Sequence, residues 1–403
     1  MPPTAEVSDH ATRATAQARA LARPPADISS QALYFPAACL WAGLVLPWSV
    51  LAILGLLPAP VRLATPTGHA HEMLLGFALA VVAGYQLPPL PRLRARTLFG
   101  LWLAARVAFL AGPVPVMLAL ALDAAFAAAL ALHVTPRLFR AAKKLRNRVL
   151  PAVLAGLCAA AVGLDGAMLG SAQAAAALAV VVVLLLAGLM TFMGGRLVAA
   201  EAAGQLYRQG EVLTPRVQPR IEAAVLVLLA TALASAVHPA GDWLLRLACA
   251  GAGVLSLVRM ARWRLWACRG RPDLVSLASG YLWLALGLLG MGLAAPGAAR
   301  TAALHLVTVG ALGSFTLNVM LNTMLLKARL PREEQRLPLA ATACIALAAL
   351  LRATAAFAGA DAQALLLLAS ACWSAGFVAA FVRIVQCVRR ATARARMAPG
   401  PPA

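Results

Sequence analysis

Charged side chains are scarce in this chain of 403 residues, where they make up 12% of the sequence while hydrophobic side chains make up 62%. A soluble core of this length cannot use so much apolar side chain, so the composition excludes an ordinary soluble globular protein. Acidic residues are scarcer still, with 14 Asp and Glu against 35 Lys and Arg. Whether the resulting net charge of +21 marks a nucleic-acid-binding surface depends on where the basic residues lie.

Several motifs that would define other classes of protein are missing as well. The seven cysteines are scattered and form no C-x-x-C pair, so they offer neither a disulfide framework nor a c-type haem attachment site. No P-loop is present, so nucleotide-driven pumping by this chain alone is not expected. Residues 1–31 contain no apolar segment of the kind found in signal peptides, and we expect them to form a disordered cytoplasmic tail.

What the sequence does contain is a series of apolar runs long enough to cross a bilayer, which takes about 20 residues as a helix. Continuous runs predict helices, because backbone in lipid must satisfy its own hydrogen bonds. We therefore predict an all-α, polytopic transmembrane bundle over residues 32–388, followed by a cytoplasmic tail over residues 389–403. The twelve predicted spans are 32–57, 69–90, 97–112, 113–134, 149–170, 172–199, 221–237, 242–258, 274–296, 301–326, 338–359 and 362–387.

The basic residues alternate between the two ends of these spans. The two tails and the loops after the even-numbered spans hold 28 of the 35 Lys and Arg residues, whereas the loops on the opposite side hold only Arg62 and Arg300. Positive residues gather on the cytoplasmic side of membrane proteins, so both termini are predicted to be cytoplasmic. The positive charge thus indicates topology and contact with a lipid bilayer, and we expect no nucleic-acid partner.

Three of the six histidines share one predicted depth near the outer face. His69 and His71 begin the second span, and His305 lies near the start of the tenth. Positions i and i+2 of a regular helix point about 200° apart, so either His69 still belongs to the entry loop or the two histidines have different partners. Because neutral imidazole binds copper, zinc and haem iron, these histidines are candidate metal ligands.

Glu72 lies on one helix face with Gly76, Ala80 and Gly84, at i+4 spacing. Small residues at that spacing allow another helix to approach closely, so Glu72 is predicted to face a packed neighbour rather than lipid. There it would orient a ligating imidazole through the second ring nitrogen, as carboxylates often do. Alternatively it would bind the metal itself or pass protons.

Further polar positions lie within or beside the predicted spans. Arg106 and Asp123 lie at compatible depths on adjacent spans and predict a structural ion pair. Asp165 has no local partner, and Arg352 at the outer end of the eleventh span is the candidate. Arg196 is expected to extend to the cytoplasm or to pair with Glu201.

The segment GHAHEMLLGFALAVVAGY at 68–85 resembles the H-A-H-E-M-x-x-G-F signature of the NnrS family. Weaker matches are GGR at 194–196, GYLWL at 280–284 and HLVTVGALGSFTLNVM at 305–320. The resemblance implies a multi-pass protein of the bacterial inner membrane that contains haem and copper and is associated with nitric oxide stress. It implies His69, His71, Glu72 and His305 as cofactor-binding or metal-site residues, and Arg196 as a retained polar position. Ala278 stands where the family pattern has a histidine, so the chain resembles a divergent member.

The function favoured by these observations is therefore that of an NnrS-like membrane protein that binds haem, copper or both through histidines near the extracytoplasmic face. Whether it is an enzyme does not follow from the sequence. The alternative is a twelve-helix transporter of a solute or metal complex without a redox cofactor. A six-plus-six repeat of the kind found in transporters would pair the second span with the eighth, which shows no such match.

Overall fold

The computed structural model describes residues 27–112, 114–214, 216–330 and 336–397. Within those ranges the regular elements are all helices, and no strand is formed, as the apolar runs predict. Ten helical segments are long and apolar enough to cross a membrane. The segments Pro66–Gln86 and Arg92–Leu110 raise the number to twelve, so the predicted spans are confirmed in number and order. Most of the expected amino-terminal tail lies outside the described residues.

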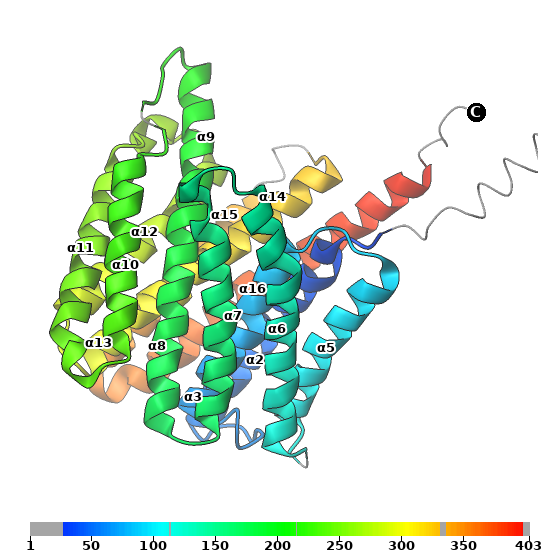
Figure 1. Ribbon diagram of the computed structural model, residues 1–403, viewed down its shortest axis with the longest axis vertical. Coiled ribbons are helices and arrows are strands. Elements are labelled where there is room, and N and C mark those ends of the chain that lie inside the picture. Colours follow the sequence, from blue (N-terminus) through cyan, green and yellow to red (C-terminus); the bar gives the residue numbers. More distant parts are fainter. Residues whose placement is uncertain (1–26, 113, 215, 331–335, 398–403) are drawn as a thin grey trace, which may run out of the picture.

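The helical segments shown in Figure 1 follow one another in the order α2 (Ser30–Ile53), α3 (Pro66–His71), η1 (Glu72–Ala78), α4 (Leu79–Gln86), α5 (Arg92–Leu110), α6 (Val116–Ala141), α7 (Val149–Met168), α8 (Ala172–Leu189), η3 (Met190–Gly194), α9 (Gly195–Arg208), α10 (Pro219–Ala236), α11 (Asp242–Ala261), α12 (Pro272–Leu293), α13 (Ala298–His305), η6 (Leu306–Leu312), α14 (Gly313–Ala328), α15 (Arg336–Thr354) and α16 (Ala362–Met397). Helix α16 extends to Met397, ten residues beyond the predicted end of the last span at 387. Its Ala- and Arg-rich end favours helix even outside the apolar run, so the predicted tail begins as helix.

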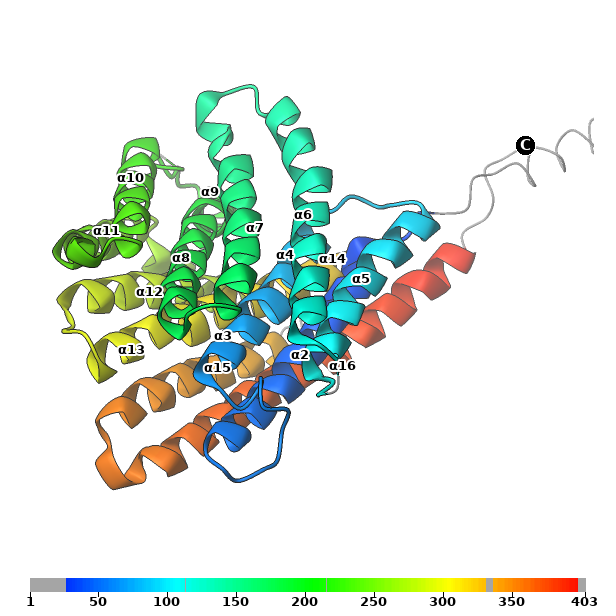
Figure 2. The ribbon, with the colours of Figure 1, turned by 60° about the horizontal axis from the view of Figure 1, so that its bottom comes forward.

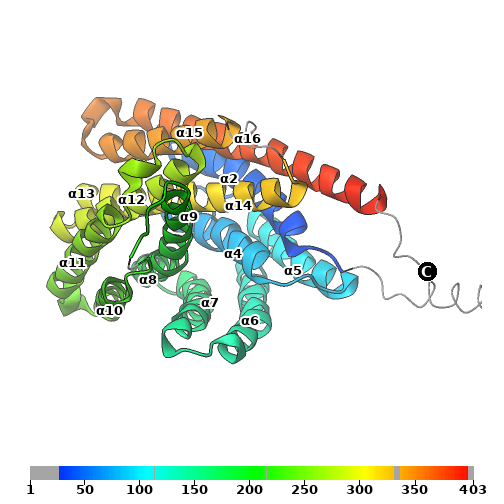
Figure 3. The same ribbon diagram turned by 90° about the horizontal axis from the view of Figure 1, so that it is seen from above.

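The second, sixth and tenth spans form the centre of the bundle. Each contains a π-helical segment, namely η1, η3 and η6. In the view from above, α4, α9 and α14 lie between α15 and α16 on one side and α6 and α7 on the other (Figure 3). Figure 2 shows α2 beside α16, which packs along it. An apolar cavity of about 90 Å³ lies between the three central spans, lined by side chains that include Ala78, Met190 and Phe315.

Contacts between distant segments fix which helix ends share a side. Ile28, before α2, donates its N–H to the carbonyl of Leu90, after α4, at 2.8 Å. The Nζ of Lys327 at the end of α14 donates to Ser29 Oγ at 3.2 Å. These contacts place the start of the first span on the same side of the bundle as the ends of the second and tenth spans, as the alternating basic loops predict. Which side faces the cytoplasm remains a prediction from the positive charges.

The predicted glycine stripe of the second span faces packed side chains. A Cβ atom at Gly76 would lie 2.7 Å from Trp41 Nε1, and one at Gly84 would lie 2.6 Å from the Phe35 ring. Both distances are too short for a real contact. The second span and α2 therefore approach each other more closely at these two positions than any residue but glycine allows. The prediction that the Glu72 face turns away from lipid is confirmed, since Glu72 is fully buried.

Candidate functional site: two histidine clusters

The start of the second span is fixed by a helix cap. The Thr65 hydroxyl accepts the N–H of Gly68 at 3.0 Å, and Pro66 occupies the first helical position, an arrangement that favours helix initiation. A Cβ at Gly68 would lie 1.7 Å from the carbonyl oxygen of Arg62, so glycine lets the preceding loop fold back onto the helix. His69 and His71 therefore both lie in the helix, and His69 does not belong to the entry loop. The alternative holds, namely that the two histidines have different partners.

His69 and His305 line one small cavity of about 50 Å³, together with Arg352 and Trp373. The hydroxyl of Ser49 donates to the Leu63 carbonyl at 2.8 Å and lies 3.1 Å from His69 Nδ1. Because the hydroxyl proton is engaged, Ser49 accepts the Nδ1–H of His69.

The Nδ1–H of His305 donates to the Thr301 carbonyl at 2.7 Å. Both rings therefore carry their proton on Nδ1. Their Nε2 atoms have no hydrogen-bond partner among the described residues. Two neutral imidazoles, each with an unused Nε2 lone pair, thus border the same cavity.

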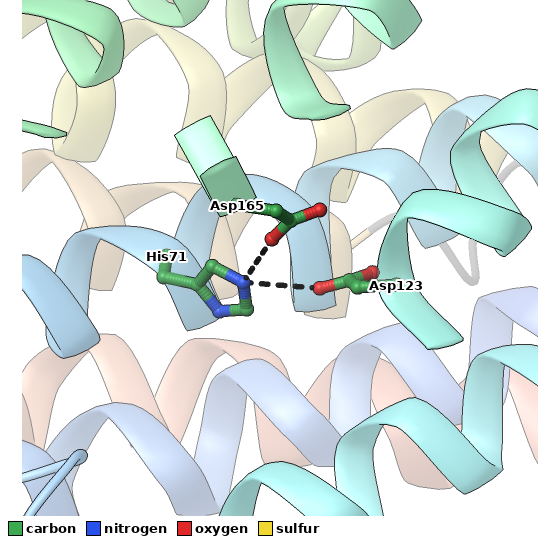
Figure 4. Close-up of side chains that lie close together, drawn as sticks. All are labelled: His71, Asp123 and Asp165. Atoms are coloured by element: carbon green, nitrogen blue, oxygen red, sulfur yellow. Dashed lines mark hydrogen bonds and ion pairs between the residues drawn. The ribbon is translucent and has the colours of Figure 1, made fainter. Parts of the chain in front are cut away.

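His71 lies in a different cluster and is fully buried. Its Nδ1 lies 2.9 Å from Glu72 Oε1, and its Nε2 lies 2.9 Å from Asp165 Oδ1 and 3.1 Å from Asp123 Oδ2. Figure 4 shows the two aspartates approaching the same ring nitrogen from α7 and α6. The Phe109 ring stacks on the imidazole with ring centroids 4.5 Å apart. Both nitrogens of His71 therefore face carboxylates.

A buried arginine joins the carboxylates of this cluster. Arg106 Nη1 donates to Glu72 Oε1 at 2.6 Å, and Nη2 donates to Asp123 Oδ2. The predicted Arg106–Asp123 ion pair is thus confirmed. Trp41 Nε1 donates to the other oxygen of Glu72 at 3.0 Å.

The predicted partnership between Asp165 and Arg352 is wrong. Asp165 contacts His71, and Arg352 borders the cavity of His69 and His305 instead. The contact between Asp123 and His71 was not predicted. The shared outer depth of Asp123, Asp165 and His71 in the predicted spans was the signal that could have suggested it.

Arg196 belongs to a third polar group, at the other end of the bundle. The predicted pairing with Glu201 is wrong, whereas the extension of Arg196 toward the cytoplasm stays a prediction. Arg196 Nη2 donates to Glu222 Oε1 at 3.0 Å, while Arg259 Nη2 donates to Glu222 Oε2 at 2.6 Å. Glu201 pairs with Arg271. Sequence reasoning missed Glu222 and Arg259, although both lie at the inner ends of predicted spans, as Arg196 does. Arg196 thus helps to neutralise a buried glutamate.

These features define a multi-pass helical membrane protein whose second span directs one histidine into a small cavity and another into a carboxylate cluster. The family model described as NnrS protein matches residues 33–391, so the chain belongs to the NnrS family. Among curated proteins and among solved structures, no match is found. Ala278, where the family pattern suggested a histidine, is buried among apolar side chains.

Proposed function

We propose that this protein is an NnrS-type protein of the bacterial inner membrane that acts in the nitric oxide response and binds copper through His69 and His305. The observation that carries the proposal is the pair of imidazoles that border one cavity with Nδ1 anchored and Nε2 unused. Metal-binding histidines generally donate their other N–H to a hydroxyl, carbonyl or carboxylate, which fixes the tautomer that can bind metal. Ser49 and Thr301 have that role here.

The size and chemistry of the cavity fit a copper ion. Imidazole nitrogen is a suitable ligand for copper, and about 50 Å³ has room for an ion and a small ligand, since one water takes up about 30 Å³. The remaining lining is largely apolar and includes Leu46, Val50 and Val309, which limits the access of water. Copper bound there would supply one-electron redox chemistry and a coordination position for a diatomic ligand.

Haem, which the family resemblance also implies, does not fit this cavity. Pockets for ligands of that size measure about 300 Å³ or more, several times the space between His69 and His305. A larger cavity of about 380 Å³ opens between α8, α11 and α13, but its lining includes a single histidine, His238. We therefore propose copper alone for His69 and His305.

The apolar cavity between the three central spans supports nitric oxide as the small molecule concerned. Its volume of about 90 Å³ exceeds that of a diatomic molecule, and nearly all of its surface is apolar. Apolar cavities of this kind stay dry and take up small uncharged ligands. A cavity between membrane-spanning helices is also accessible to molecules that dissolve in lipid.

The experiment is a measurement of copper in protein purified in mild detergent from copper-replete cells. We expect equimolar copper in the wild type and loss of copper in His69→Ala and His305→Ala, with unchanged yield and elution profile. His133→Ala is the matched control, because His133 Nδ1 contacts the Ala129 carbonyl at 2.8 Å in the same manner as His305 contacts Thr301. That variant should keep its copper.

Wild-type protein without copper, or His305→Ala with full copper content, would overturn the assignment. Absorption spectra recorded on the same samples test the cofactor itself. A haem Soret band that disappears in His305→Ala would show that the histidine pair binds haem and that the cavity opens to admit it, in contradiction to the copper assignment.

A further inference from the structure

We infer that His71, Asp123 and Asp165 form a second metal site, which binds a divalent first-row transition-metal cation and is separate from the copper site. One ligand atom from each of these residues lies within 4.8 Å of the other two. The two aspartate oxygens lie 2.9 and 3.1 Å from the same imidazole nitrogen. Around an ion with bonds of about 2.1 Å, neighbouring ligand atoms are about 3.0–3.4 Å apart, so small shifts would accommodate the cation.

The hydrogen bonding of His71 is that of a metal ligand. Its Nδ1 donates to Glu72, and a carboxylate on that nitrogen leaves Nε2 to bind the metal in a carboxylate–histidine–metal arrangement. On Nε2 a single N–H would have to serve two carboxylates, which it cannot do well. Asp165 Oδ2 and Asp123 Oδ1, on side chains that are only 3% and 1% exposed, have no hydrogen-bond partner among the described residues. Each aspartate thus presents one oxygen to Nε2 and keeps its second oxygen buried and unsatisfied, and this surplus of buried negative charge indicates a missing positive ligand.

The net charge of the His71 cluster indicates the charge of the missing positive ligand. Three carboxylates, those of Glu72, Asp123 and Asp165, contribute −3, and Arg106 contributes +1, which leaves −2 around a neutral His71. Uncompensated charge inside a membrane is expensive, so such a group needs neutralisation. A divalent cation restores neutrality in one step. Two protons would do so as well, and the experiment below separates the two.

The donor set distinguishes this site from the one proposed for copper. One imidazole with two carboxylates favours Zn²⁺, Fe²⁺ or Mn²⁺, whereas two imidazoles suit copper. Three protein ligands leave at least one coordination position for water or a substrate, as in catalytic rather than structural zinc sites. Arg106 binds the same oxygens of Glu72 and Asp123 that face His71 and is thus a positioning residue for these carboxylates. His69 and His71 direct the two proposed sites to opposite faces of one helix.

The experiment is a Zn²⁺ titration of full-length protein that has been purified in detergent, stripped with a chelator and exchanged into chelator-free buffer. We expect equimolar binding to the wild type and at least about tenfold weaker binding to Asp165→Asn, which removes a charge and keeps the shape. Asp242→Asn is the matched control, because Asp242 pairs with Arg300 outside the cluster. It should bind Zn²⁺ like the wild type.

Copper measured in the same proteins before the chelator treatment separates this inference from the proposed function. Asp165→Asn should lose zinc and keep copper, while His305→Ala should lose copper and keep zinc. Failure of one pattern leaves the other intact, so the two assignments stand or fall separately.

Wild-type protein that binds neither Zn²⁺ nor Mn²⁺ would overturn the inference and assign the neutralising charge to protons. Equal Zn²⁺ affinity in the wild type and Asp165→Asn would overturn it too. Should that variant not fold, Co²⁺ provides the test in the wild type alone. We expect visible d–d absorption that Zn²⁺ abolishes by competition, and the absence of such absorption contradicts the site.

Discussion

Alanine at Gly76 should destabilise the bundle through the His71 cluster rather than through the helix that contains it. The new Cβ would lie 2.7 Å from Trp41 Nε1, 2.9 Å from Glu72 Oε2 and 3.0 Å from Arg106 Nη1. All three atoms are held by buried hydrogen bonds, so none can move without breaking one. The hydrogen bond from Trp41 to Glu72 is the first that the methyl group would displace.

The expected magnitude follows from two contributions. Overpacking a buried site costs about 1–3 kcal/mol, and losing a hydrogen bond to a charged group costs about 1.5–3 kcal/mol. Alanine recovers at most about 1 kcal/mol through its higher helix propensity. The net loss in unfolding free energy is therefore about 1.5–5 kcal/mol.

Gly100→Ala is the matched control. A Cβ at Gly100, in the interior of α5, meets no atom within 4 Å. The same substitution should there stabilise the protein by about 0.5–1 kcal/mol, because it only removes the flexibility of glycine from a helix.

The assay is the temperature at which half of the detergent-solubilised protein loses its monodisperse elution peak. We expect Gly76→Ala to lower that temperature by about 5 °C or more and Gly100→Ala to raise it slightly. Equal temperatures for the two variants would refute the reasoning, since the close contact at Gly76 is then not present in the folded protein.

Three further predictions concern other parts of the chain. Reporter fusions at Arg140 should report a cytoplasmic location, because the loop that follows α6 is the most basic of all; an extracytoplasmic signal would reverse the topology. Arg259→Met should lower the same melting midpoint through a loss of about 1.5–3 kcal/mol in unfolding free energy, since it removes a buried hydrogen bond to the charged Glu222 and leaves Arg196 as the remaining partner, whereas exposed Arg262→Met should change it little. Arg352→Gln should tighten copper binding on the order of tenfold, because it removes a positive charge from the wall of the cavity; unchanged affinity in a copper titration would contradict that role.

The sequence by itself determined the number of spans, their relative sidedness and the depth of the histidines. These properties depend on local quantities, namely the length of each apolar run and the position of each basic loop. The i+2 spacing of His69 and His71 also determined that a regular helix sends them to different partners. The small residues at Gly76 and Gly84 identified a face of close packing in the same local way.

Only the tertiary structure decided which helix meets which face. His71 contacts Asp165 across 94 positions of sequence, and His69 shares its cavity with His305 and Arg352 from two other spans. Depth along the membrane normal had suggested Arg352 as the partner of Asp165, because the two lie at the same level. Helical periodicity gives the depth and direction of a side chain but not the identity of the neighbour opposite. That neighbour is fixed by packing across the whole bundle, where glycines such as Gly76 allow only certain helices to come close.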